Sequence, residues 1–447
     1  MKPKRITWTC GAVLAFFIPA ALAQAQQAGR QMPVPAARGL ALESDSSQPQ
    51  ADTHTLSSIE TLGIGSLGVL RSIIDPSFTI SQSGDTGIVP GMKNSSTSLG
   101  MNLAFDRNWS RSRLIGSYGG AQVLYHPYSA LNSRYHNLSV AQEFQFSRWI
   151  FRLNDKLTVA PEASFGGLDT GGTNTQRTLK SSLGVNDTIL TQRAKRIANT
   201  ASGEVNYYLS RRSIVTVAGS FASLNFSDPG YIDTQRITGR VGYDYALNPK
   251  DSIALLYDHG RTDFSTASVR QQTDTIQLSY GRKVTGRLAL QIAAGPQLLR
   301  SSSQSSSLDW NLSSTMNYQT RRTQYSVSFD RAPSSGSGVF LGSATNIATA
   351  SVHHALTRSW AASLGAGYAF DQALVPVNGT IEHFRNWYGN ASVGRLVGHH
   401  VRFDLNYRFQ RQGAGTGTCP VLACGSTQSR HTLGMTLGWH PWSFYPR

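Results

Sequence analysis

The chain has 447 residues, of which 40% are hydrophobic and 15% charged, and its formal net charge is +16. It contains no apolar run of about eighteen residues, the length that a membrane-spanning helix needs, and this excludes a helical membrane protein. A positive charge is compatible with nucleic acid, an anionic membrane surface or an anionic solute as a partner. Because the basic residues are thinly spread and the N-terminus predicts export, we expect no nucleic-acid partner.

The N-terminus has the pattern of a secretory signal peptide over residues 1–23. Lys2, Lys4 and Arg5 precede an apolar stretch that ends in a small-residue cleavage site at Ala23. Cleavage after Ala25 is the alternative. Either cut removes three basic residues, which lowers the net charge to +13, and also removes Cys10.

Two further segments precede the first predicted strand. Residues 24–54 are rich in Gln, Ala, Pro and Ser without periodicity, which predicts a disordered leader. Residues 55–76 carry apolar residues at nearly helical spacing, interrupted by glycines. We interpret them as a short pre-barrel segment that leans on the barrel mouth, and a plug or periplasmic docking element is the alternative. The barrel is expected over residues 77–447.

The stretch from Thr275 to Gln297 shows the strand pattern most clearly. Ile276, Leu278 and Tyr280 alternate with polar residues, a four-residue joint follows, and the alternation resumes from Leu288. Alternation with period two predicts strands with one apolar and one polar face. Each arm is about twelve residues long, which exceeds the usual five or six and suits a tilted strand that crosses a bilayer. The hairpin therefore predicts part of a transmembrane barrel.

The same pattern recurs along the chain and predicts a single antiparallel, all-β barrel of about 18 strands. Alternation is weak in 77–83 and in 339–354, so sixteen is the alternative count. The predicted strands are 77–83, 96–106, 112–125, 134–147, 156–168, 193–209, 212–226, 234–247, 251–264, 270–284, 286–300, 306–319, 322–331, 339–354, 358–370, 380–396, 399–411 and 428–440.

The connections between the predicted strands alternate between short and long. Leu209–Arg212 and Val397–His399 are short, whereas Gly167–Gln192 and Gln412–Thr427 are long. Outer-membrane barrels have short periplasmic turns and longer outer loops. An even strand count then places both mature termini in the periplasm.

Aromatic residues near predicted strand ends, among them Trp149, Tyr207 and Trp360, match the girdles of a membrane barrel. The last predicted strand contains the stretch from His431 to Trp439, which ends on an aromatic residue, and the chain continues through Pro441 to Arg447. With the signal peptide and the loop asymmetry, this resembles the bacterial outer-membrane β-barrels, porin-like and similar also to polysaccharide-export barrels. The resemblance implies the outer membrane of a Gram-negative bacterium. The implied partners are outer-membrane lipid, the barrel-assembly machinery and, for an exporter, a periplasmic export partner.

Along each predicted strand, every second position carries a polar side chain. Charged residues at these positions should face the lumen, because a charge that faces lipid is costly. Arginines there form either a path that selects anions or, with carboxylates of the same parity, ladders that brace a wet interior. The candidate anion path is Arg196, Arg236, Arg240, Arg402 and Arg408. The inward carboxylates are Glu143, Glu204, Asp244, Asp258, Asp309, Glu382 and Asp404.

Other chemistry is sparse in the sequence. Cys419 and Cys424 lie in one long loop of an exported protein, which predicts a disulfide. Adjacent histidines at 353–354 and 399–400 face opposite sides of a strand or lie in a turn, so we expect no metal site. No nucleophile elbow is present, and we expect no catalytic residues and no cofactor.

The predicted function is a channel for passive passage of hydrophilic, anionic solutes or of an exported polysaccharide. A barrel with a structural or surface role and no transport is one alternative, and an outer-membrane barrel hydrolase is the other.

Overall fold

In a computed structural model the chain forms one closed, all-antiparallel barrel of 18 strands, as the sequence predicts. The structure describes residues 73–86, 94–126, 128–160, 189, 195–265, 269–357, 359–376, 381–398, 400–414 and 428–441. The strands are β1 Ile73–Asp85, β2 Asn94–Asn108, β3 Ser112–His126, β4 Ser133–Gln145, β5 Trp149–Ala160, β6 Arg196–Tyr208, β7 Ser213–Phe226, β8 Thr234–Ala246, β9 Asp251–Phe264, β10 Val269–Lys283, β11 Leu288–Ser301, β12 Gln304–Gln319, β13 Thr323–Ser334, β14 Ser343–Ala355, β15 Trp360–Ala373, β16 His383–Val397, β17 Val401–Ala414 and β18 Gln428–Trp439.

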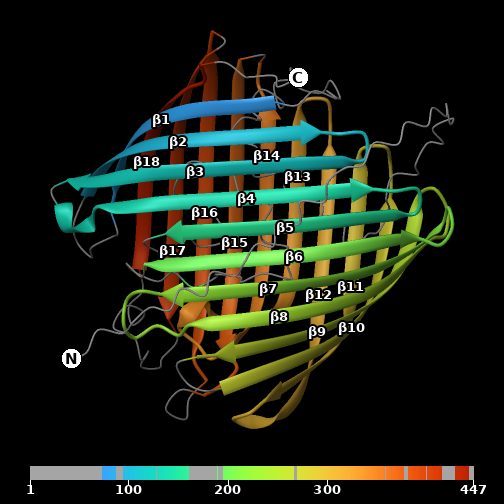
Figure 1. Ribbon diagram of the computed structural model, residues 1–447. Coiled ribbons are helices and arrows are strands. Elements are labelled where there is room, and N and C mark those ends of the chain that lie inside the picture. Colours follow the sequence, from blue (N-terminus) through green and yellow to red (C-terminus); the bar gives the residue numbers. More distant parts are fainter. Residues whose placement is uncertain are drawn as a thin grey trace, which may run out of the picture. The chain divides into compact units, whose positions relative to one another are not determined.

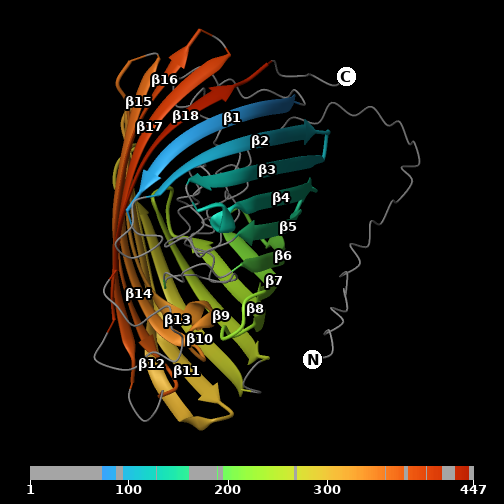
Figure 2. The same ribbon diagram turned by 90° about the vertical axis from the view of Figure 1, so that its left-hand side faces the viewer.

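Every strand pairs with its neighbour in sequence, and the barrel closes between the two ends of the chain. β1 pairs with β18 from Phe78 opposite Trp439 to Asp85 opposite Thr432. In Figure 1, β2 to β8 cross the near wall, and β12 to β17 run behind them at a steep angle. Figure 2 shows β1 lying between β18 and β2 at this seam. Closure pairs every strand on both sides, apart from the first residues of β1, and this is what a strand assembly needs in lipid.

The two faces of each strand differ as the alternation predicts. On β10, Ile276 and Leu278 are 53% and 55% exposed on the outer face, whereas Thr275 and Ser279 are 5% and 0% exposed on the inner face. The partners of Leu278 in the ladder, Leu255 on β9 and Ala294 on β11, share its outward direction. The outside of the barrel is therefore apolar and the inside polar, which is the arrangement of a transmembrane barrel.

Aromatic pairs mark both edges of the outward apolar band. Near the short connections, the rings of Trp149 and Tyr207 lie 4.3 Å apart between centroids. Towards the opposite end, the rings of Tyr368 and Trp387 lie 4.5 Å apart. Amphipathic rings favour the two membrane interfaces, so these pairs indicate where the interfaces lie. None of the described helices is long and apolar enough to cross a membrane.

The two ends of the barrel differ in their connections, as predicted. At one end, short turns such as 209–212 and 320–322 join neighbouring strands. Longer segments join them at the other end, among them 161–195 and 415–427, although 302–303 between β11 and β12 is short. β1 begins and β18 ends at the short-turn end.

The first strand is longer than expected, because β1 begins at Ile73 instead of residue 77. Residues 73–77 pair only with β2, since the ladder to β18 starts at Phe78. Pro76, which lacks an N–H donor, is tolerated on this locally free side.

The largest error of the sequence prediction concerns the fifth strand, placed at 156–168. The structure has β5 at Trp149–Ala160. Asp155 breaks the apolar alternation on the outward face, where the Asn199 side-chain nitrogen donates a hydrogen bond to its carboxylate at 2.9 Å. The predicted strand 339–354 is also too long, because β14 begins at Ser343.

Candidate functional site: the barrel interior and its inner loop

The connection between β13 and β14, residues 335–342, is called the inner loop here. It contains a single 3-10 turn at Gly336–Gly338. Four of its residues have a positive φ, namely Gly336, Ser337, Gly338 and Gly342. Three of the four are glycines, which adopt this region at low cost. The glycine-rich sequence therefore folds into a compact turn where a pair of long strands would otherwise continue.

Contacts across the barrel show that the inner loop lies inside it. The backbone N–H of Ile232, which precedes β8, donates to the carbonyl oxygen of Gly338 at 2.8 Å. The Gln271 side chain on β10 donates to the carbonyl oxygen of Leu341 at 2.7 Å. Since β11 and β12 separate β10 from β13, the loop reaches these partners only through the interior. It therefore occupies part of the barrel's cross-section.

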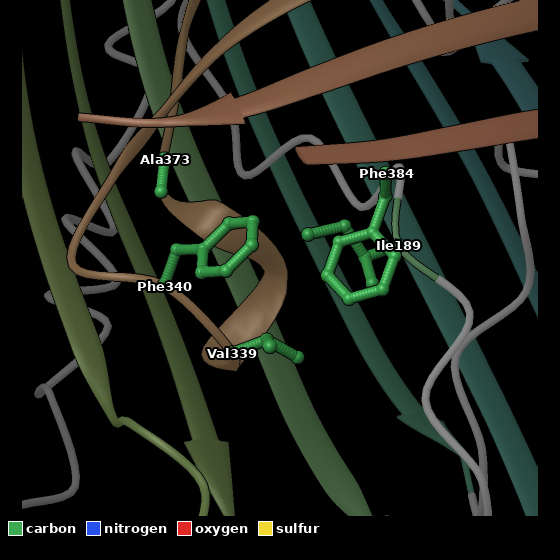
Figure 3. Packing of buried hydrophobic residues seen from close by; sticks show 5 residues of the cluster. All are labelled: Ile189, Val339, Phe340, Ala373 and Phe384. Carbon is green, nitrogen blue, oxygen red and sulfur yellow. The ribbon is translucent and has the colours of Figure 1, made fainter. Parts of the chain in front are cut away.

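A buried apolar cluster packs the loop against Ile189 and against residues of β15 and β16, the strands that follow β14 (Figure 3). Val339 and Phe340 of the loop pack with Ile189, Ala373 and Phe384, and all five are nearly inaccessible to solvent. The Phe340 and Phe384 rings lie 5.4 Å apart. The backbone N–H of Ile189 also donates to the Ser337 hydroxyl at 3.3 Å. The loop is thus fixed by apolar packing next to β15 and β16 and by hydrogen bonds from Ile232 and Gln271 on the other side.

The close fit between the loop and β7 depends on a residue without a side chain. A Cβ added at Gly338 would lie 2.2 Å from the Phe226 ring. That ring stacks on Tyr231 with centroids 5.0 Å apart. Tyr231 lies between β7 and β8, where burial, and secondarily the Asp228 carboxylate, raises the pKa of its hydroxyl. The phenol therefore stays neutral at physiological pH, and the surface that meets the loop is apolar at this point.

Arg236 on β8 lies beside the end of β13, where the inner loop begins. Its guanidinium donates to the carbonyl oxygen of Pro333 at 3.4 Å. Among the residues that the structure describes, it forms no ion pair with a carboxylate. Arg240, two inward positions further along β8, instead pairs with Asp258 on β9. Arg236 therefore places a positive charge beside the loop without a direct carboxylate contact, although the Asp258 carboxylate lies close enough to attract it.

All five arginines of the predicted anion path face the interior, but they do not lie together. Arg196 stands at the end of β6 that bears the long connections, and Arg236 and Arg240 are on β8. Arg402 and Arg408 are on β17, half-way round the barrel from β8. Arg402 donates to Asp404, two residues along its own strand, at 2.7 Å. The predicted path is thus two separate groups, and at least one member of each is paired with a carboxylate.

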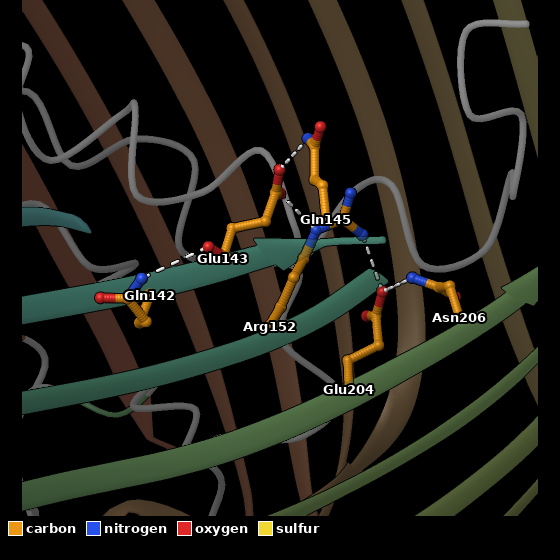
Figure 4. Close-up of polar contacts among 6 residues, drawn as sticks. All are labelled: Gln142, Glu143, Gln145, Arg152, Glu204 and Asn206. Carbon is orange, nitrogen blue, oxygen red and sulfur yellow. Dashed lines mark hydrogen bonds and ion pairs between the residues drawn. The ribbon is translucent and has the colours of Figure 1, made fainter. Parts of the chain in front are cut away.

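A ladder of charged side chains spans the interior of β4, β5 and β6 near the short turns (Figure 4). Arg152 bridges Glu143 and Glu204, with a nitrogen–oxygen distance of 2.9 Å to each. Asn206 donates to Glu204 and accepts a hydrogen bond from Thr216 at 2.6 Å. Because each charge here has an oppositely charged partner, these residues brace the barrel wall and do not form a path that selects anions. Arg152 was missed in the sequence because β5 was placed too late to include it.

Other residues singled out in the sequence have structural partners or lie outside the described part of the chain. His354 hydrogen-bonds the Thr323 hydroxyl at 2.7 Å on the outer face, and His353 points inward. His400 hydrogen-bonds the carbonyl oxygen of His440 at 2.8 Å, just beyond β18. The predicted disulfide of Cys419 and Cys424, His399, the signal peptide, the leader and residues 55–72 lie outside the described residues. Within the described ranges, no group of three or more His, Cys, Asp or Glu side chains is placed to hold a metal ion.

Comparison with known proteins adds little to this picture. No protein-family model matches the chain, and no curated protein matches it. Several solved structures from Pseudomonas aeruginosa are similar at low identity. OpdQ is 10% identical with a TM-score of 0.43, over 83% of this chain and 99% of OpdQ. The outer membrane protein OpdK is 9% identical with a TM-score of 0.44, over 83% and 99%. OccK2 (OpdF), solved in complex with glucuronate, is 10% identical with a TM-score of 0.42, over 83% and 98%.

Proposed function

We propose that the protein is an outer-membrane channel through which small hydrophilic solutes, preferably anions, diffuse passively. The observation that carries the proposal is a closed barrel with an apolar exterior and a polar interior, into which the inner loop folds. A barrel of this strand count is wide enough for an aqueous passage. The inner loop restricts that passage.

The inner loop favours small solutes over a polymer. It is packed against Phe226 on one side and Phe384 on the other, so it narrows the interior at one level. An exported polysaccharide would need this loop to be displaced while the chain passes. The proposal is therefore restricted to small solutes, and no export partner is invoked.

The preference for anions follows from the charges near the loop. Arg236 lies beside the narrowed level and makes no ion pair with a carboxylate of the described residues, whereas Arg240 and Arg402 pair directly with Asp258 and Asp404. Rings or clusters of basic side chains select anions in pores. The excess of basic residues over the whole chain acts in the same direction.

The orientation that we propose has the short turns and both strand termini in the periplasm, and the long connections outside the cell. It follows from the rule that outer-membrane barrels keep their turns short on the periplasmic side. Lipid and the assembly machinery are then the partners that every such barrel requires.

Single-channel recording of the refolded mature protein tests the function. We expect steady ionic conductance and uptake of small sugars into proteoliposomes, with exclusion of long oligosaccharides. A correctly folded protein without conductance, with or without residues 24–74, would support the structural alternative. Passage of long oligosaccharides would contradict the restriction to small solutes, and hydrolysis of added lipid or ester substrates would favour the enzyme alternative.

A further inference from the structure

The outer surface of the barrel carries a group of charged residues that the channel proposal does not use. It lies on β9, β10 and β11, at the end of these strands that bears the long connections. We call it the outer arginine patch; its members are His259, Arg261, Asp263, Arg270, Asp274 and Arg300. They occupy the same alternating positions of the strands as the outward residues Leu255, Ile276 and Leu278, so they also face away from the lumen.

Ion pairs within the patch leave a net positive charge. Asp263 is shared by Arg261 and Arg270, at 2.9 and 2.8 Å. Asp274 is shared by His259 and Arg300, at 2.8 and 3.4 Å. Two carboxylates thus stand against three arginines and a histidine. The three arginine side chains are 41%, 53% and 55% exposed, and each guanidinium has five N–H donors, which leaves several for a ligand from outside.

The patch adjoins the apolar surface directly. The Tyr257 hydroxyl, on the last apolar outward side chain of β9, donates to Asp274 at 2.8 Å. Along β9 only Ile253, Leu255 and Tyr257 face outward between Asp251, at the short-turn end, and His259, towards the long connections. At the usual rise and tilt this apolar span covers roughly 20 Å, against about 25 Å for the apolar band of outer-membrane barrels. The patch therefore lies at the depth of the lipid headgroups of one leaflet.

We propose that the outer arginine patch binds the phosphate groups of an anionic lipid in the outer leaflet, with its acyl chains on the adjoining apolar surface. Guanidinium groups pair with phosphate oxygens through two parallel hydrogen bonds, which suits clustered arginines at this depth. Charge complementarity selects the headgroup, and Leu255, Ile276 and Leu278 supply the surface for the chains. The inference rests on the proposed membrane orientation, but not on conduction.

The test compares binding of diphosphoryl and fully dephosphorylated lipid A to the full mature chain in detergent, measured by native mass spectrometry. We expect wild type to retain the diphosphoryl form at least tenfold more tightly, with a difference that shrinks as salt screens the charges. The variant Arg261→Gln/Arg270→Gln/Arg300→Gln should lose on the order of tenfold to a hundredfold in affinity for it. Equal retention of the two lipids by wild type would overturn the proposal without any mutation.

A matched variant controls for charge. Arg107→Gln/Arg282→Gln/Arg395→Gln removes three outward arginines at the short-turn end and should leave lipid A affinity within about twofold of wild type. Equal loss in both variants would show non-specific attraction and overturn the proposal. Heat-dependent migration on SDS gels confirms that each variant is folded. Conductance, recorded in parallel, separates the two claims: a barrel that does not conduct but needs its patch for lipid binding refutes the channel alone.

Discussion

Arg236 is the residue whose environment bears most directly on selectivity. It lies inside the barrel beside the inner loop and has no carboxylate partner among the described residues, whereas Arg402 is paired with Asp404 at the short-turn end. We expect Arg236→Gln to shift the reversal potential under a salt gradient clearly towards cations. Arg402→Gln changes the charge equally but away from the loop, so it should shift the potential less. Equal shifts would mean that the anion preference is set by overall charge instead of by this position.

Val327 and Ser326, neighbours on β13, test the assignment of the two faces. Val327 is 43% exposed on the outer face, and Ser326 faces the interior. Val327→Arg should cost about 2–4 kcal/mol, because it places a charge against lipid, whereas Ser326→Arg meets water and should be tolerated. Unfolding by urea in lipid vesicles measures both. Comparable losses would show that the face assignment of this strand is wrong.

At the scale of single elements, the inner loop is the part that a simple hairpin can replace. Ser334 and Ser343 are ladder partners, so β13 and β14 need only a two-residue turn to connect them. Replacing residues 335–342 by Asn-Gly supplies a favoured turn of that length. The variant should fold and show a larger single-channel conductance and uptake of larger sugars than wild type.

Two alanine substitutions within the loop test whether its buried anchor, and not any side chain of the loop, sets the conductance. Phe340→Ala removes a buried ring that packs on Phe384, whereas Leu341→Ala removes a partly exposed side chain of the same loop. Conductance should become larger and noisier in the first variant and stay close to wild type in the second. If the Asn-Gly variant conducts no better than wild type, the loop does not limit passage.

The strands were predictable from the sequence because each carries its own period of two, but the inner loop was not. Between β13 and β14 the sequence offers glycines and serines, and alternation alone extended the strand back to Val339. What places the loop inside is the packing of Phe340 on Phe384 of β16 and the contacts of Gly338 with Phe226 of β7 and with Ile232, all of them partners distant in sequence. The inward direction of the five arginines was likewise predictable by parity. Their separation into two groups was not, since it depends on which strands lie opposite each other around the closed barrel.

At the scale of the whole molecule, the barrel depends on one seam that no local connection supports. β1 and β18 are the first and last strands, so only ladder hydrogen bonds and side chains hold them together. Asp85 at the end of β1 accepts from Arg430 and, at 3.0 Å, from the Thr432 hydroxyl, both on β18. The two charged side chains are only 6% and 11% exposed. Removal of one member of so buried a pair is costly, because it deletes a charge-assisted contact in a place that water hardly reaches.

We therefore expect Asp85→Ala to cost roughly 3 kcal/mol in the free energy of unfolding and to lower the temperature at which the barrel opens in SDS. Asp106→Ala is the matched control, because Asp106 pairs with Arg113 across a hairpin that a short turn already joins. That pair is also more exposed, so its loss should cost well under half as much. The exchange Asp85→Arg/Arg430→Asp should recover part of the stability, since it restores opposite charges across the seam. Equal losses in the two alanine variants, or an exchange no more stable than Asp85→Ala, would show that the ladder alone closes the barrel.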